Sequence, residues 1–371
     1  MEKLSYDLTE VEESMKDASC ILDNSIRNTY QPIPERRGRL LHPTPGRFCI
    51  AFPMDAIDGS GARICYRVWK EIIPDAFNRY KYIGDVAKTN LEYFSGFRFV
   101  PKALKMKCDG RLVPGIVMDW IEGITLDKFL NGKWVDLTNR ARIAFIQDFY
   151  YMCYQLRAKG IAHGDLSCLN IMVTPANRIR LVDYDSVYVS SMGNNFYQVT
   201  GGAEGFQHPD RINSKNPLLA SIDDDNFSQL IIALSLWVAF FEPSITQRYD
   251  ESNLLFLPGD LSGISSSDRL KNLKNSYGWK IAKKYCTQFA HISTLMSALE
   301  SIQDSVSQVP SLLKFVSRNT IQSENFYSKL AGVTISKVKY CTACGNIFTN
   351  DDFDYCTHCG SKRHVYKTVS L

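Results

Sequence analysis

The sequence lacks a hydrophobic run long enough to cross a membrane. Its most apolar stretch, residues 230–241, is interrupted by Ser235 and is about half as long as the roughly 20 residues that a spanning helix needs. The first residues, MEKLSYDLTEVEES, are acidic and contain no apolar segment like that of a secretory signal. We therefore expect a cytoplasmic protein that does not contact a membrane.

A large charge of one sign is also lacking, because 43 Lys and Arg residues are nearly balanced by 39 Asp and Glu residues. The net charge of +4 does not by itself indicate a nucleic acid or an anionic membrane as partner. Hydrophobic residues make up 45% of the chain and aromatic residues 12%, which predicts a sizeable core and argues against long disorder. A length of 371 residues suggests two or three folding units.

The spacing of apolar residues predicts both strands and helices. Strands are expected at residues 48–52, 63–69, 97–104, 116–121, 171–173 and 179–182, and helices at residues 9–22, 75–90, 138–159 and 225–241. The first helix is expected to begin with a capping box of Thr9 and Glu12. The last is apolar on almost every side, which predicts a buried helix. Residues 31–47, rich in Pro, Gly and Arg, are expected to be irregular.

Two polar segments carry the clearest chemical signal. His163-Gly-Asp-Leu-Ser-Cys-Leu-Asn170 follows the long predicted helix, and Leu181-Val-Asp-Tyr-Asp185 ends a short predicted strand. Asp165 and Asn170 are five residues apart, and Asp183 follows Asp165 by 18 residues. An Asp and an Asn alone could simply cap a turn between strands. The ordered set, followed by Val-Asp-Tyr-Asp, is much harder to explain in that way.

These segments resemble the protein kinase superfamily, in its divergent, bacterial, eukaryotic-like Ser/Thr kinase type, where an H-R-D-x-x-x-x-N loop precedes a D-F-G metal site. The resemblance covers roughly residues 38–300 and implies an α+β, two-lobed protein-kinase-like fold. By this resemblance Asp165 would be the catalytic base that accepts the proton of the substrate hydroxyl. Asn170 and Asp183 would hold Mg²⁺ against the phosphates of ATP through hard oxygen ligands.

The segment Val117-Met-Asp-Trp-Ile-Glu-Gly123 looks like the hinge between the lobes of a kinase. Met118 would then be the gatekeeper, and the backbone of Asp119 and Ile121 would hydrogen-bond the adenine of ATP. Taken alone, the same residues are equally well explained as an ordinary amphipathic strand.

Two nucleotide-binding features of the family are poorly matched. The phosphate-covering loop reads His42-Pro-Thr-Pro-Gly46, with one glycine, and each Pro lacks the N–H that could approach a phosphate. The usual third-strand Lys is replaced by Arg67, with Lys70 as the rival position, and Arg differs from Lys in how it binds phosphate. Asp85 is the nearest acidic candidate for the helix residue that should pair with this cation.

The class of substrate is indicated by further positions. Gly164 stands where the family has Arg, and Asp185 stands where it has Gly, which is similar to the aminoglycoside and choline kinase branch. Against a small-molecule kinase, Phe206-Gln-His-Pro-Asp210 resembles the A-P-E end of an activation segment. Asp225, which opens the buried helix, resembles the Asp that anchors the catalytic loop. We therefore expect phosphorylation of a protein Ser or Thr hydroxyl, with a small-molecule kinase or a nucleotide-binding pseudokinase scaffold as alternatives.

The last residues contain two CxxC motifs separated by 11 residues. Four thiolates suit tetrahedral Zn²⁺, so a structural zinc ribbon is predicted, with these ligands: Cys341, Cys344, Cys356 and Cys359. The ribbon is expected to dock on the kinase or on a protein partner. Lys362, Arg363 and Lys367 are offset by acidic residues, so no nucleic-acid face is indicated.

The predicted organisation therefore has five parts. These are an N-terminal helical extension (1–37), a kinase N-lobe (38–121), a kinase C-lobe (122–300), a helical connector (301–335) and a zinc ribbon (336–371). The implied cofactors are ATP, Mg²⁺ and structural Zn²⁺.

We expect the purified protein to carry about one zinc ion per chain, because four thiolates complete a tetrahedral site. Cys341→Ser or Cys359→Ser should release the ion, since structural zinc contributes on the order of 10 kcal/mol to units this small. Elemental analysis of the wild type and both variants checks this. A wild-type protein without zinc, or with a disulfide in its place, would contradict the prediction.

Overall fold

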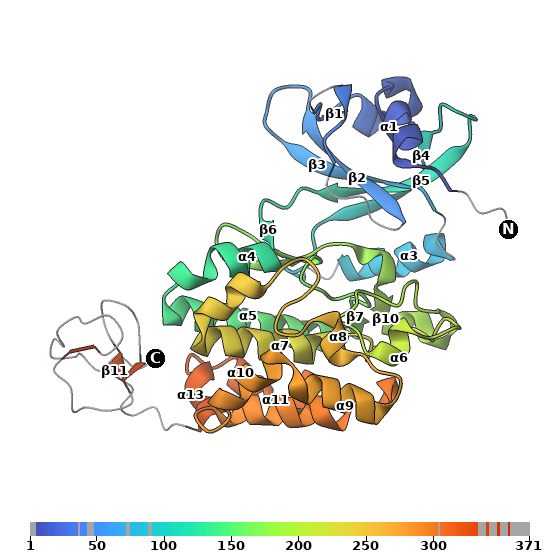
Figure 1. The fold of residues 1–371 in the computed structure, drawn as a ribbon. Coiled ribbons are helices and arrows are strands. Elements are labelled where there is room, and N and C mark those ends of the chain that lie inside the picture. Colours follow the sequence, from blue (N-terminus) through green and yellow to red (C-terminus); the bar gives the residue numbers. More distant parts are fainter. Residues whose placement is uncertain are drawn as a thin grey trace. The chain divides into compact units, whose positions relative to one another are not determined.

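The computed structural model has a mixed α+β fold and describes residues 5–35, 38–42, 48–71, 75–87, 91–302, 305–332, 339–340, 347–348 and 355–356 (Figure 1). The chain divides into two compact units. The N-terminal unit comprises Met1–Glu122 with Arg180–Asp185, and the C-terminal unit comprises Gly123–Ile179 with Ser186–Leu371. Within the described part of the chain, no helix has both the length and the apolarity needed to span a membrane.

The N-terminal unit is built on an antiparallel sheet with the strand order β1-β2-β3-β5-β4. Its strands are β1 (Tyr30–Pro32), β2 (Cys49–Ala56), β3 (Arg63–Trp69), β4 (Phe97–Lys105) and β5 (Leu112–Asp119). Four of them confirm the predicted strands. The prediction of irregular chain over residues 31–47 is wrong at its start, because β1 forms there. A three-residue edge strand is too short for alternation to reveal it.

The helix α1 (Leu8–Met15) completes the core of this unit, with Val11 and Met15 buried in the same apolar cluster as strand residues such as Phe52. It is followed by a 3-10 helix, η1 (Ala18–Cys20), and by α2 (Asn24–Arg27). The capping box is formed by Asp7 and Glu10, not by the predicted Thr9 and Glu12.

Glu12 is buried and bonds to residues far along the chain, which its spacing from Thr9 does not indicate. Its carboxylate accepts a hydrogen bond from the N–H of Leu40 at 2.5 Å and pairs with Arg39 at 2.8 Å. The predicted single helix over residues 9–22 is also interrupted, since the Asp17 carboxylate accepts from the N–H of Ser19 and opens η1.

The helix α3 (Ala76–Ala87) packs on β4 of the same sheet. The ring of Tyr80 is stacked on Phe99, with centroids 5.3 Å apart, and also contacts Trp69 and Phe97. Tyr80 is 2% exposed. These ring contacts fix the orientation of the Tyr80 side chain and so the position of its hydroxyl.

The C-terminal unit is mainly helical (Figure 1). Its α-helices are α4 (Leu126–Gly132), α5 (Asn139–Ala158), α6 (Pro209–Ile212), α7 (Asn226–Phe241), α8 (Pro258–Leu261), α9 (Ser266–Asn275), α10 (Tyr277–Tyr285), α11 (Ala290–Ser301), α12 (Arg318–Ile321) and α13 (Phe326–Ala331). Its 3-10 helices are η3 (Trp134–Asp136), η4 (Tyr184–Ser186, shared between the units), η5 (Ser190–Asn195), η6 (Pro243–Arg248), η7 (Val306–Gln308) and η8 (Leu312–Lys314).

Short strands accompany these helices: β6 (Ile124–Thr125), β7 (Ile161–Ala162), β8 (Ile171–Val173), β9 (Ile179–Leu181), β10 (Tyr188–Val189), β11 (Lys339–Tyr340) and β12 (Ile347–Phe348). β6 pairs antiparallel with β8, β7 with β10, and β11 with β12. The predicted strands at 171–173 and 179–182 are confirmed.

The helix α7 is the core of the C-terminal unit, as its apolar sequence predicts. All of its residues from Asn226 to Phe240 are buried, and the ring of Trp237 packs against Phe289 of the segment before α11, at a centroid distance of 4.5 Å. The chain beyond residue 301 adds to this core. Phe326 of α13 is fully buried and contacts the ring of Tyr150 on α5 at 5.3 Å.

A buried polar triad lies in this aromatic core. The hydroxyl of Tyr150 lies 2.7 Å from Nε2 of His291 and accepts a hydrogen bond from Nε1 of Trp237 at 3.1 Å. Burial lowers the pKa of His291 to about 4. With Nε2 unprotonated, the neutral ring accepts a hydrogen bond from the Tyr150 hydroxyl, and protonation of His291 removes this acceptor.

We expect the protein to lose stability as the pH falls from 6.5 towards 4. His291 has a lower pKa in the folded chain than in the unfolded chain, so the unfolded state binds the extra proton in this window. The contribution is fully present above pH 6.5 and amounts to on the order of 3 kcal/mol. Chemical denaturation at several pH values should show a flatter dependence for His291→Gln. Equal losses in wild type and variant would contradict the prediction.

Candidate active site

The polar segment 163–170 lies in the C-terminal unit between β7 and β8, and the carboxylate of Asp225 holds its first turn. Oδ2 of Asp225 accepts from the N–H of His163 at 2.5 Å, and Oδ1 accepts from the N–H of Gly164 at 2.9 Å. All three residues are buried. Two successive backbone N–H groups bond to this one carboxylate, so the path of the turn is well defined.

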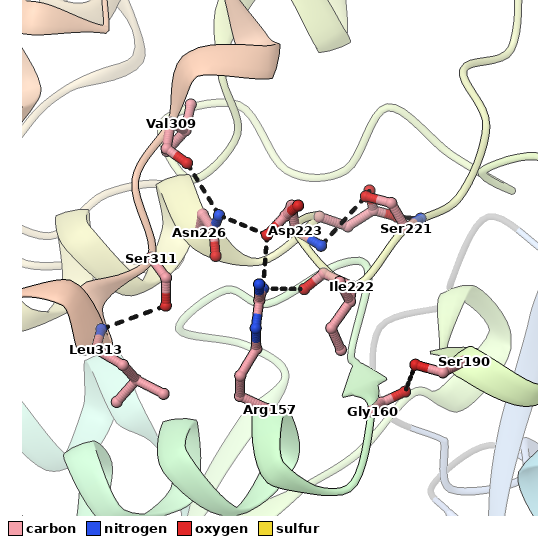
Figure 2. Close-up of polar contacts among 11 residues, drawn as sticks. Arg157, Gly160, Ser190, Ser221, Ile222, Asp223, Asn226, Val309, Ser311 and Leu313 are labelled. Atoms are coloured by element: carbon pink, nitrogen blue, oxygen red, sulfur yellow. Dashed lines mark hydrogen bonds and ion pairs between the residues drawn. The ribbon is translucent and has the colours of Figure 1, made fainter. Parts of the chain in front are cut away.

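A second layer of contacts fixes the start of α7, where Asp225 is the N-cap residue. Figure 2 shows Arg157, at the end of α5, pairing with Asp223 at 2.6 Å and donating to the carbonyl of Ile222 at 3.1 Å. The amide of Asn226 donates to Asp223 at 3.1 Å and to the carbonyl of Val309 at 2.9 Å. The residues on both sides of Asp225 are therefore tied to α5 and to the chain before η8.

Gly164 meets two backbone constraints that exclude a side chain. Its φ of +77° lies in the left-handed region, and a Cβ there would come within 2.2 Å of the carbonyl oxygen of Ser186. An Arg, which protein kinases have at the corresponding place of their motif, could not adopt this geometry without moving the chain.

Arg211 places a buried cation beside this turn. One of its Nη atoms donates to the carbonyl of Gly164 and, at 3.3 Å, to that of Thr200, while the other donates to Oε1 of Gln207 at 2.7 Å. Arg211 is 4% exposed. Sequence reasoning missed it. Its one signal was its position directly after the Phe206–Asp210 motif.

Asp165 and Asn170 are brought together by the turn. The amide nitrogen of Asn170 donates to the backbone carbonyl of Asp165 at 2.7 Å, which leaves its Oδ1 as an acceptor. Oδ1 of Asp165 accepts from the N–H of Ala203 at 3.1 Å. Both side chains are partly exposed, which suits groups that act on a ligand.

In the N-terminal unit, Arg67 on β3 is paired with both acidic residues of the Val-Asp-Tyr-Asp motif. Its Nη2 lies 2.7 Å from Oδ1 of Asp183 and 2.9 Å from Oδ2 of Asp185. The Sγ of Cys49 on β2 accepts from Nε at 3.1 Å and from Nη2 at 2.7 Å. The hydroxyl of Tyr80 donates to Oδ1 of Asp185.

The expected partner on α3 was Asp85, which is exposed, whereas Arg67 pairs with Asp183 and Asp185. The rival cation, Lys70, is three positions after Arg67. It lies one residue beyond the end of β3, where strand alternation no longer decides the side that it faces. Asp183 has a φ of 66°, a conformation that Asp tolerates better than most residues.

Burial governs the protonation of this cluster. Burial lowers the pKa of Arg67, but the carboxylates of Asp183 and Asp185 outweigh it and raise that pKa well above its ordinary value. Burial raises the pKa of Asp185 to about 6 against the opposing charge of Arg67. It also raises the pKa values of Tyr80 and Cys49, which keeps both groups neutral. At neutral pH the cluster therefore keeps the Arg67 cation beside a neutral Tyr80 and a neutral Cys49.

The predicted adenine-binding residues lie at the end of β5 and just beyond it. Met118 is buried and pairs with Cys65 and Phe97 on the neighbouring strands. The N–H of Asp119 donates to the carbonyl of Gly96 at 2.9 Å, so a role in adenine binding would fall to its own carbonyl oxygen. Ile121 is partly exposed. Gly46 lies outside the described residues.

Of the predicted zinc ligands, Cys356 is described and is 2% exposed, whereas Cys341, Cys344 and Cys359 lie outside the described residues. The hairpin of β11 and β12 pairs Tyr340 with Ile347, so the first two cysteines fall between its strands in the sequence. Over the described residues, no three His, Cys, Asp or Glu side chains gather as a metal site. No protein-family model matches the chain, and no curated protein matches it significantly.

We expect Gly164→Ala to destabilise the protein more than Gly332→Ala does. Both glycines have a positive φ, 77° and 70°, but a Cβ at position 332 meets nothing within 4 Å. The control should cost about 1 kcal/mol. Gly164→Ala should cost about 1–3 kcal/mol more, because its Cβ must displace the Ser186 carbonyl. Chemical denaturation of both variants measures this difference, and equal destabilisation would contradict the assigned turn geometry.

Proposed function

We propose that the chain is an ATP- and Mg²⁺-dependent phosphotransferase of the protein kinase type, which phosphorylates a Ser or Thr hydroxyl of a protein. The observation that carries the proposal is the pair of hydrogen bonds from His163 and Gly164 to the Asp225 carboxylate. They fix the backbone from which Asp165 and Asn170 project. A transferase that works mainly by positioning needs such a rigid turn.

In this proposal Asp165 accepts the proton of the substrate hydroxyl. At the same time the hydroxyl oxygen forms a bond to the γ-phosphorus of ATP, and ADP leaves. The N–H of Ala203 donates to Oδ1 of Asp165 at 3.1 Å and helps to hold that carboxylate in place. Magnesium, when bound, neutralises charge on the phosphates. The partly exposed carboxylate of Asp183 and the amide oxygen of Asn170 are hard oxygen donors that suit this ion.

The residue proposed to bind the ATP phosphates is Arg67. Its Nη1 is buried and has no hydrogen-bond partner among the described residues. A buried donor without a partner is costly, and a phosphate oxygen would satisfy it. The carbonyl of Asp119 and the backbone of Ile121 would hydrogen-bond adenine beside Met118, and Gly46 would belong to the loop over the phosphates.

A protein is the favoured acceptor because the segment that ends at Asp210 is firmly held. The carboxylate of Asp210 pairs with Arg269 of α9 at 2.9 Å, and the N–H of Gln198 donates to the carbonyl of Leu218 at 2.7 Å. A segment anchored at its end can offer an ordered surface to a peptide. These contacts support a protein substrate over a small alcohol.

We also propose that the two units correspond to the two lobes of a kinase-like fold. The sheet with α3 and the helical unit built around α7 are compatible with that fold. The ribbon proposal rests on the four cysteines, with a structural Zn²⁺ held by their thiolates. The burial of Cys356 supports it, because a thiolate that binds structural zinc is shielded from water.

A nucleotide-binding scaffold without transferase activity is the second candidate. It is favoured by the contact between Asp183 and Arg67, since a carboxylate that is already paired with a cation binds a metal less readily. The single glycine of the phosphate loop also favours it.

Two substitutions should separate enzyme from scaffold. Asp165→Ala should leave ATP·Mg²⁺ binding nearly intact and lower turnover by roughly 10²–10⁴-fold, the usual contribution of a positioned base. Asp183→Ala should remove both turnover and the Mg²⁺ dependence of nucleotide affinity, because the ion loses its anionic ligand. Calorimetry with a non-hydrolysable ATP analogue and a phosphate-transfer assay measure these effects. Metal-independent binding by the wild type, without transfer to any acceptor, would support the scaffold instead.

A further inference from the structure

The two carboxylates that touch Arg67 differ in their surroundings. The side chain of Asp183 is 39% exposed, whereas that of Asp185 is 6% exposed, close to the 7% of Arg67 itself. An ion can reach the first carboxylate from solvent. The second is enclosed together with the guanidinium.

Both oxygens of Asp185 are already engaged. Oδ2 accepts from Nη2 of Arg67 at 2.9 Å, and Oδ1 accepts from the hydroxyl of Tyr80. A magnesium ligand needs an oxygen that an ion with its retained waters can approach. Asp185, enclosed and holding two donors, does not offer one.

The pairing of Arg67 leads to the same conclusion. Arg67 pairs with both Asp183 and Asp185, and of the two Asp185 is the one enclosed with it. If Asp183 binds a divalent cation, Arg67 keeps its enclosed partner. If Asp185 bound the ion instead, the buried guanidinium would lose its enclosed partner, which is strongly unfavourable.

The hydroxyl of Tyr80 connects this pair to α3. Its ring is stacked on Phe99 and also packs against Trp69 and Phe97, so the hydroxyl cannot readily leave Asp185. Tyr80 of α3 bonds Asp185, and Asp185 bonds Arg67 of β3. The helix is therefore connected to Arg67 without an acidic residue of its own.

We infer that Asp185 is the permanent counter-ion of Arg67, a positioning residue held by Tyr80, and that it is not a magnesium ligand. The inference rests on the proposed nucleotide binding. It assigns the extra carboxylate of the Val-Asp-Tyr-Asp motif a different role from that of a second metal-binding acid. Asp185 thereby holds Arg67 in place for the phosphates, and Asp183 is the carboxylate assigned to the ion.

The test is calorimetric binding of a non-hydrolysable ATP analogue to the full chain, with and without Mg²⁺. Asp185→Asn should weaken binding by about tenfold or more under both conditions, because Arg67 loses its fixed partner. The ratio of the two affinities should be preserved. Asp183→Asn should instead remove the gain from Mg²⁺. Asp55→Asn breaks an exposed pair with Arg63 on the same sheet and should change neither affinity.

Tyr80→Phe provides a milder variant and a coupling test. It should weaken binding on its own and have no further effect in the Asp185→Asn background, because the hydroxyl acts through that carboxylate. Additive effects of the two substitutions, or loss of the Mg²⁺ gain in Asp185→Asn, would overturn the inference but leave the proposed function standing. A wild-type protein that does not bind the analogue would overturn the proposed function and the inference with it.

Discussion

The carboxylate of Asp225, enclosed at the start of the buried helix α7, accepts the backbone N–H groups of His163 and Gly164. The position of Asp165 and Asn170 depends on this contact, because both project from the turn that it holds. The burial of α7 makes the anchor rigid, and the contacts of Arg157 and Asn226 fix the residues on either side of it. A polar site is thus attached to the most apolar part of the unit, where the backbone has the least freedom to move.

A second constraint acts in the N-terminal unit, where a guanidinium is buried. Removing Arg67 from water would be costly without a partner, and the Asp183 and Asp185 carboxylates offset that cost. The cluster binds β2, β3, α3 and the segment Arg180–Asp185 together through polar contacts inside an apolar shell. Its partly exposed carboxylate, Asp183, is the one at which the proposed magnesium ion would bind.

The reason for a glycine at position 164 became clear only from the structure of its turn. A glycine where protein kinases have Arg first indicated only a likeness to the aminoglycoside and choline kinase branch. In the structure the glycine is required by its φ of +77° and by the Ser186 carbonyl. The nearby cation comes from Arg211, which is buried and bound to backbone carbonyls. Its hydrogen bonds to the carbonyls of Gly164 and Thr200 stabilise the turn.

The sequence by itself determined the mixed α+β class, the strands β2–β5 and the helices α3, α5 and α7. It also pointed to the polar residues on which the proposals rest, Asp165, Asn170, Asp183 and Arg67. Local periodicity and motif spacing contain that information, since they depend on neighbours within a few turns of chain. The partners of those residues were decided only by the tertiary structure. Tyr80 and Asp185 are 105 residues apart, and spacing on α3 favoured Asp85. Which side chain reaches a buried charge depends on packing between distant segments, about which local periodicity contains no information.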